Sequence, residues 1–222
     1  MPCSAQSVTT AGVISARGIN EFHFNQNVAQ LLRAQIEKSG RAQAFIINED
    51  GADIELVERT EIARAQDADL FVSVHHDSVQ PHYLSKWMVD GEARFYSDHL
   101  RGYSLFYARN GVTPQASLAL AQQIGTQLRA AGFEPTLHHS EKIQGENRQL
   151  VDAELGIYNF DQLVMLKTAE IPAVLLECGI IVNREEEQLL SDPVYQNKLV
   201  TAVATAIGAS CEQRSRLELE SN

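Results

Sequence analysis

The 222-residue sequence has little positive charge. It contains 18 Lys and Arg residues against 29 Asp and Glu residues, which gives a formal net charge of −11 at pH 7. Nucleic acids and anionic membranes are bound chiefly through positive charge, so the composition argues against both as main partners. A polar or cationic substrate is compatible with this charge balance.

Cysteine is also scarce, with Cys3, Cys178 and Cys211 as the three members. They show no C-x-x-C spacing for a metal, and an odd number gives no disulfide framework. We interpret Cys178 as a small buried residue beside the end of a strand.

Long apolar runs are missing. No segment approaches the ~18 apolar residues of a membrane span. The first residues show no basic segment followed by an apolar one, so no signal peptide is visible. Apolar residues still make up 44% of the sequence. A chain of this length buries roughly 70% of its unfolded surface, so we expect it to fold without a disulfide or a structural metal.

Predicted helices and strands alternate along most of the chain. Apolar spacing of 3.6 residues predicts helices, and short apolar runs predict strands. We expect helices over residues 21–39, 54–65, 114–131 and 193–207, strands over residues 44–47, 70–74, 103–108, 133–138 and 172–179, and a surface loop over residues 78–99. This alternation predicts one α/β domain with a mixed, mostly parallel sheet and helices on both faces. We assign residues 1–210 to the domain and residues 211–222 to a polar C-terminal tail.

Two predicted strands end on polar side chains. The first ends on His75, the second on Glu177, and a third polar residue, Glu21, opens the first helix. In an open α/β sheet, ligands gather at the C-terminal ends of the strands, so these three side chains can converge. Imidazole and carboxylate are ordinary ligands of catalytic zinc, and a free carboxylate beside the metal can move protons. Simpler roles remain open, because a carboxylate is favoured in the first turn of a helix and a histidine can form a hydrogen bond at a strand end.

Four segments, in order along the chain, resemble the zinc-dependent N-acetylmuramoyl-L-alanine amidases of bacterial cell-wall hydrolysis. Residues 17–25 resemble the glycine–glutamate entry to the first helix of that family, and residues 56–63 resemble its second helix. Residues 69–75 are similar to its strand that ends in a zinc-binding histidine. Residues 172–190 resemble its last catalytic block.

The resemblance implies roles for three residues. Glu21 and His75 match zinc ligands, and Glu177 matches the catalytic glutamate. The implied reaction is zinc-dependent hydrolysis of the amide bond between N-acetylmuramic acid and L-alanine in peptidoglycan, with Glu177 acting first as base and then as acid. The implied substrate is peptidoglycan or a muropeptide, and the implied location is the cell envelope or periplasm. The sequence does not indicate a protein activator.

The start of the chain departs from this resemblance. The family begins with an apolar strand that ends in aspartate–x–glycine–histidine, and that histidine is its first zinc ligand. The matching position here is Gln6, whose amide is a weak, neutral ligand. Three interpretations follow. The chain is a truncated version of an active enzyme, or a non-catalytic relative that binds peptidoglycan or regulates a partner, or another residue completes the site.

Four residues are candidates for completing the site: Cys3, His23, His76 and His139. A cysteine is a good zinc ligand, but Cys3 is very near the terminus. We expect His23 to point off the helix face that carries Glu21. We expect His76 to point to the opposite side of its strand from His75.

Overall fold

The computed structural model of the chain describes residues 12–220, with side chains described to residue 213. The predictions made for Cys3 and Gln6 lie outside the described residues. In chain order, the elements are α1 (Glu21–Ser39), α2 (Leu56–Ala65), β1 (Phe71–Asp77), η1 (Pro81–Tyr83), β2 (Ser85–Val89), β3 (Glu92–Tyr96), β4 (Ser104–Tyr107), α3 (Pro114–Ala130), η2 (His138–Ser140), β5 (Gln149–Asp152), β6 (Ile157–Asn159), α4 (Val164–Thr168), β7 (Ala173–Ile180), α5 (Arg184–Leu190) and α6 (Pro193–Glu220).

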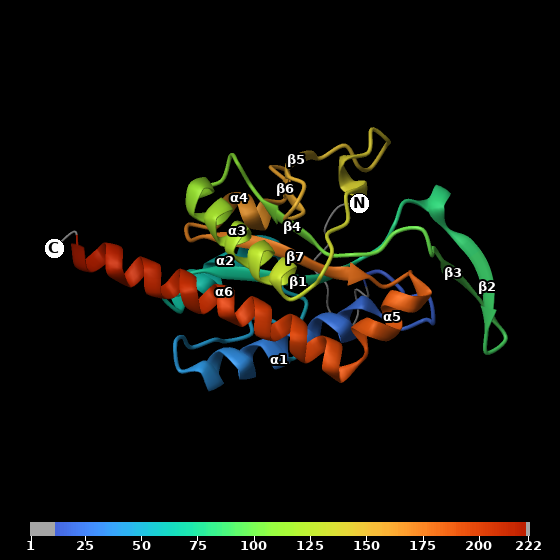
Figure 1. Cartoon of the computed structure of the whole chain (residues 1–222), viewed down its shortest axis with the longest axis horizontal. Coiled ribbons are helices and arrows are strands. Elements are labelled where there is room, and N and C mark those ends of the chain that lie inside the picture. Colours follow the sequence, from blue (N-terminus) through green and yellow to red (C-terminus); the bar gives the residue numbers. More distant parts are fainter. Residues whose placement is uncertain (1–11, 221–222) are drawn as a thin grey trace.

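Within residues 12–220, five strands form the central sheet in the order β1-β7-β4-β6-β5. Parallel pairing joins β1 to β7 and β4 to β6, and antiparallel pairing joins β7 to β4 and β6 to β5. A separate antiparallel hairpin, β2–β3, projects from the body of the molecule (Figure 1). The prediction of a single α/β domain with a mixed sheet is confirmed.

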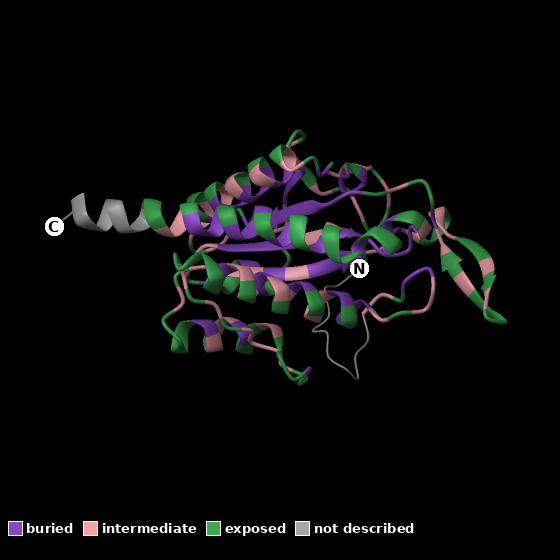
Figure 2. Cartoon of the chain, turned by 60° about the horizontal axis from the view of Figure 1, so that its bottom comes forward, coloured by how far each residue is buried: buried purple, intermediate pink, exposed green. Residues whose placement is uncertain are grey.

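Both faces of the sheet are covered by helices. On β7, Val174 and Leu176 belong to the larger core cluster, which includes residues of α1, α3 and α6. The alternate residues Ala173 and Leu175 belong to a second cluster with residues of α4. This division follows from the two-residue period of a strand. Figure 2 shows the buried strands enclosed between helices whose outer surfaces are exposed.

Helix α1 forms where its apolar period predicts it. Phe24, Val28, Leu32 and Ile36 recur every four residues, and all four are buried. Full burial of such a side chain stabilises the fold by roughly 1.5–3 kcal/mol. The helix ends at Gly40, whose φ of 66° is left-handed and favours glycine.

Two predicted strands do not form. Residues 44–47 are not in a strand, because a strand needs a hydrogen-bonded neighbour and this segment pairs with none in the described part of the chain. In residues 133–138 a single bridge, between Tyr103 and Pro135, replaces the expected strand. Proline lacks the N–H that would continue the ladder.

The segment predicted as a long loop, residues 78–99, contains the short helix η1 and the β2–β3 hairpin. Asp90 and Gly91 form the two-residue turn, since Val89 pairs with Glu92. Both turn residues have positive φ angles, 50° and 84°, as a tight hairpin turn of this type requires. The Asp-Gly dipeptide is therefore the sequence signal for this hairpin, and the loop prediction overlooked it.

The C-terminal helix is longer than expected. Helix α6 does not end at Ile207 but continues through the polar segment to Glu220. The prediction also missed β5, β6 and α5, which are three to seven residues long.

No helix in the described part of the chain is both long and apolar enough to cross a membrane.

Candidate active site

Three neighbouring strands place polar side chains in one row. His75 of β1 is the register partner of Glu177 on β7, and Glu177 faces Ser104 of β4 on its other side. Side chains at facing positions point to the same face of a sheet. The Glu177 Oε2 and Ser104 Oγ atoms are buried and have no hydrogen-bond partner in the described residues. The row therefore presents polar atoms that are free to bind a ligand.

Glu21 reaches this row from the first turn of α1. The whole residue is 2% exposed. The Oε1 atom lies 3.1 Å from His75 Nδ1 and accepts a hydrogen bond from the backbone N–H of His76 at 3.2 Å. Asn25 Nδ2 donates to Oε1 at 3.1 Å, and Val13 N donates to Oε2 at 3.1 Å. These contacts hold the buried carboxylate against the end of β1, as the prediction of convergence requires.

Glu177 lies in an electrostatic environment that disfavours its charge. Burial raises its pKa well above the usual value, and the carboxylates of Asp77 and Glu21 raise it further. The guanidinium of Arg148 opposes this shift. A carboxyl group with a raised pKa holds its proton more readily than an ordinary one, which suits a general acid–base group.

The Glu21–His75 pair has the donor chemistry of a zinc site. Zinc–ligand bonds of about 2.1 Å at tetrahedral angles place neighbouring ligand atoms about 3.4 Å apart. The 3.1 Å between Oε1 and Nδ1 is close to this value. A catalytic zinc takes three protein ligands, and in the described part of the chain no third metal-binding atom joins this pair within 4.8 Å. The residues present thus fit two of the three protein ligands.

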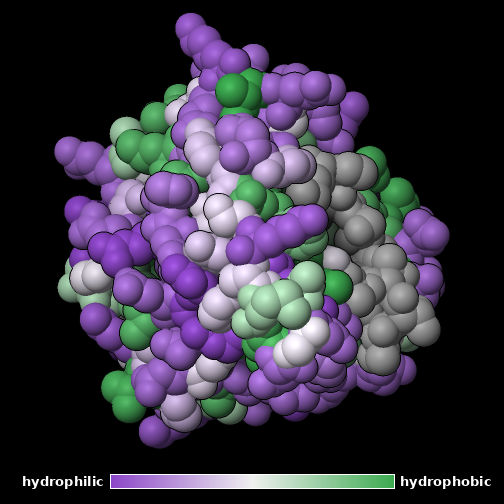
Figure 3. Space-filling view, turned by 90° about the vertical axis from the view of Figure 1, so that its right-hand side faces the viewer, coloured by the Kyte–Doolittle hydropathy of each residue, from purple (hydrophilic) through white to green (hydrophobic). Residues whose placement is uncertain are grey.

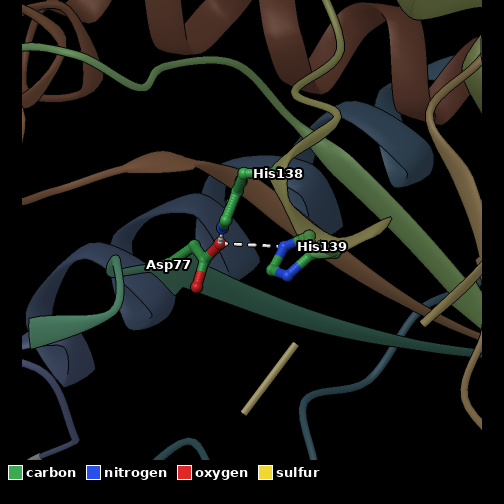
Figure 4. Close-up of side chains that lie close together, drawn as sticks. All are labelled: Asp77, His138 and His139. Carbon is green, nitrogen blue, oxygen red and sulfur yellow. Dashed lines mark ion pairs between the residues drawn. The ribbon is translucent and has the colours of Figure 1, made fainter. Parts of the chain in front are cut away.

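A second polar cluster, which we call the Asp77 cluster, comprises Asp77, His138 and His139. Asp77 Oδ2 lies 3.3 Å from His138 Nε2 and 3.0 Å from His139 Nε2. Figure 4 shows the two rings approaching the carboxylate from η2. His138 was not predicted. His139 was a candidate for completing the first site, but the structure brings it to Asp77. In the sequence, the adjacent pair His138-His139 is the signal that could have indicated this cluster.

The far side of each imidazole in the Asp77 cluster is also bound. Thr136 Oγ1 lies 2.9 Å from His138 Nδ1, and Glu146 Oε2 lies 2.9 Å from His139 Nδ1. Burial lowers the pKa of His139, but Asp77 and Glu146 outweigh it and raise that pKa above its ordinary value. Burial likewise opposes ionisation of Asp77, and the two histidines overcome it and lower the pKa of Asp77.

The remaining histidine candidates point elsewhere. His76 Nδ1 lies 2.7 Å from Asn25 Oδ1, and its ring packs against Phe24 of α1. Burial lowers the pKa of His76 to about 3, so this side chain is neutral. His23 is exposed. The expectation that neither joins His75 and Glu21 agrees with these positions.

The surface at the hairpin end of the molecule is mostly hydrophilic, with scattered apolar side chains (Figure 3). Strand β7 points toward this end (Figure 1). The carboxyl ends of the parallel strands β1 and β7 therefore point toward this mostly hydrophilic end of the molecule. Such a face suits a polar ligand.

The fold and the site define an α/β protein with a histidine–carboxylate site at its strand ends. Residues 5–209 match the sequence profile of the N-acetylmuramoyl-L-alanine amidases. The chain belongs to this family, which consists of hydrolases.

Individual relatives agree with this assignment. The protein described as "Probable N-acetylmuramoyl-L-alanine amidase AmiB" of Haemophilus influenzae is 27% identical over 209 residues, covering 85% of this chain and 46% of its own length. The chain thus spans about half of that relative. N-acetylmuramoyl-L-alanine amidase AmiA of Escherichia coli is 26% identical, with 88% of this chain and 70% of its own length covered. The crystal structure of the amidase Ami1 of Mycobacterium smegmatis has the same fold, with a TM-score of 0.71 at 20% identity over 91% of this chain and 82% of that one.

Proposed function

We propose that this protein hydrolyses the amide bond between N-acetylmuramic acid and the L-alanine of peptidoglycan in the cell envelope. The observation that carries the proposal is the convergence of Glu21, His75 and Glu177 in the C-terminal halves of β1 and β7. Family membership supports it, as does the polar face at this end of the molecule.

Glu21 and His75 would hold a zinc ion through Oε1 and Nδ1. When bound, zinc lowers the pKa of a coordinated water and polarises the substrate carbonyl. Glu177 would take a proton from the attacking water and deliver it to the nitrogen of the leaving L-alanine. The raised pKa of Glu177 suits both steps, because the group must be able to gain and lose a proton in one cycle.

The test is the isosteric substitution Glu177→Gln, assayed as release of stem peptides from purified peptidoglycan. General acid–base catalysis contributes about 10²–10⁴-fold, so we expect a loss of at least about 100-fold. Glu185→Gln is the matched control, because Glu185 is exposed on α5. Unchanged turnover in Glu177→Gln would remove this residue from the mechanism.

The second candidate function is binding of peptidoglycan, or regulation, without cleavage. Gln6 favours it, because the resemblance places a zinc-binding histidine at that position. In this case the unmodified chain would co-sediment with peptidoglycan and release no stem peptide at any zinc concentration. Release of stem peptide that depends on Glu177 would exclude it.

A further inference from the structure

The Asp77 cluster has three buried ligand atoms that converge without being satisfied. The Oδ2 atom of Asp77 and the Nε2 atoms of His138 and His139 are buried, and none of the three makes a hydrogen bond of acceptable geometry among the described residues. They nevertheless lie within 4.8 Å of one another. The two histidine side chains are 1% and 6% exposed. Ion-pair distance without hydrogen-bond geometry is compatible with three ligands that surround a central ion.

The spacing also fits a metal. Donor atoms on a tetrahedral zinc ion lie about 3.4 Å apart. The two separations from Asp77 Oδ2 are 3.3 and 3.0 Å. Two imidazoles and one carboxylate form a ligand set that suits zinc and other divalent transition metals.

The atoms behind the ligands support the same interpretation. A metal-binding histidine almost always uses its other ring nitrogen to bind a carboxylate, a carbonyl or water. Here His138 Nδ1 contacts the Thr136 hydroxyl and His139 Nδ1 contacts the Glu146 carboxylate. Arg148 and Gln80 in turn bind Glu146. Both rings are thus fixed with Nε2 directed at Asp77.

We propose that Asp77, His138 and His139 bind a divalent transition-metal ion, Zn²⁺ by their chemistry, with ligands distinct from Glu21 and His75. The ion would join η2 to the end of β1. It would thereby fix the segment that carries Glu146 and Arg148 beside the row formed by His75, Glu177 and Ser104. The proposal does not depend on amidase activity, because its ligands and its test are separate from those of the first site.

The test is titration of the purified full chain with Co²⁺, read as the visible absorption of the bound ion, in a Glu21→Ala, His75→Ala background that disables the first pair. We expect this background to bind one Co²⁺. Adding His138→Ala and His139→Ala should weaken binding at least about 100-fold, since two of three ligands are lost. His99→Ala is the matched control, because His99 is exposed and outside the cluster.

A second readout is thermal stability with Zn²⁺. In the same background, Zn²⁺ at about 100 times its Kd should raise the Tm on the order of 5 °C, and the His138→Ala, His139→Ala chain should show no shift. If those substitutions prevent folding, Asp77→Asn keeps the shape of the side chain and removes its charge, and should also abolish the shift. Equal Co²⁺ binding with and without the cluster, or no binding in the background chain, would overturn the proposal.

Discussion

His75 and Glu177 face each other across the parallel pair β1–β7. This places the proposed metal ligand next to the proposed proton carrier, although about a hundred residues of sequence separate them. The adjacency follows from the topology, because parallel neighbours end at the same edge of the sheet.

Removal of either ligand of the first site should abolish hydrolysis. Glu21→Ala and His75→Ala each remove one of the two described ligands. Loss of a residue that only supports a metal ligand lowers activity by up to about 100-fold. Loss of a ligand itself should therefore lower peptidoglycan hydrolysis at least about 100-fold. Chelation with EDTA should have the same effect on the unmodified chain, and added Zn²⁺ should restore activity there. His82→Ala, an exposed histidine of η1, is the control. Full activity in EDTA would contradict a metal-dependent reaction.

Glu186 should make stability depend on pH. Burial raises its pKa to about 7, although the backbone N–H groups of Ile180 and Gly102 donate to it and oppose the shift. The folded-state pKa is above the unfolded value of 4.5. The contribution of Glu186 is therefore complete below pH 4.5 and is lost as pH rises through 7, by an amount on the order of 3 kcal/mol.

The measurement is urea unfolding from pH 4.5 to 8.5. The glutamine in Glu186→Gln cannot ionise. As pH rises, the unfolding free energy of the unmodified chain should therefore fall relative to that of this variant. The pH dependence of this difference is more informative than its size at one pH. The NH₂ group of the glutamine would face a backbone N–H donor, which lowers the stability of the variant at every pH. Glu185→Gln should leave the pH profile unchanged. A constant difference between the unmodified chain and Glu186→Gln would mean that Glu186 does not titrate in this range.

The sequence predicts the longer helices, the strands β1, β4 and β7, and one of the two polar clusters. Helix α1 has a clear apolar period, and β7 is a continuous apolar run, so both were found. The sequence predicts that Glu21, His75 and Glu177 converge, because each stands at the end of a predicted element. In the structure His75 and Glu177 lie two and three residues before the ends of β1 and β7. The sequence does not predict the Asp77 cluster, because it assigns His138 to the end of a strand over residues 133–138, whereas the structure has a single bridge at Pro135 and the short helix η2 from His138. Which loop packs over the end of β1 depends on tertiary packing, and no local pattern encodes it.

Gly102 should tolerate no side chain. Its φ is +109°, and an added Cβ would lie 2.5 Å from the backbone oxygen of Glu134. Gly91 has a similar φ of +84°, but a Cβ there meets nothing within 4 Å. We expect Gly91→Ala to cost about 1 kcal/mol for backbone strain alone, and Gly102→Ala to cost about 3 kcal/mol or more. Thermal and urea unfolding of both variants measure this difference. Equal costs would show that β4 can shift to relieve the contact.

The single tryptophan, Trp87, should report on how the hairpin is attached to the body. Trp87 Nε1 donates a hydrogen bond to the backbone oxygen of Ala16 at 2.9 Å. The guanidinium of Arg184 lies 5.1 Å from the centre of its ring and also pairs with Asp98. The guanidinium of Arg17 also lies over the ring, 5.4 Å from its centre. Arg184→Ala removes one of these two cations and the ion pair with Asp98, so the indole should become more exposed to water.

We expect a red shift of the Trp87 fluorescence and stronger quenching by acrylamide in Arg184→Ala. Lys86→Ala is the matched control, because Lys86 lies on the same hairpin but its ammonium stacks on Phe95. An isolated hairpin of two strands is marginally stable in water, so its position depends on contacts such as these. An unchanged spectrum in Arg184→Ala would mean that the bond from Trp87 to Ala16 holds the hairpin without the arginine.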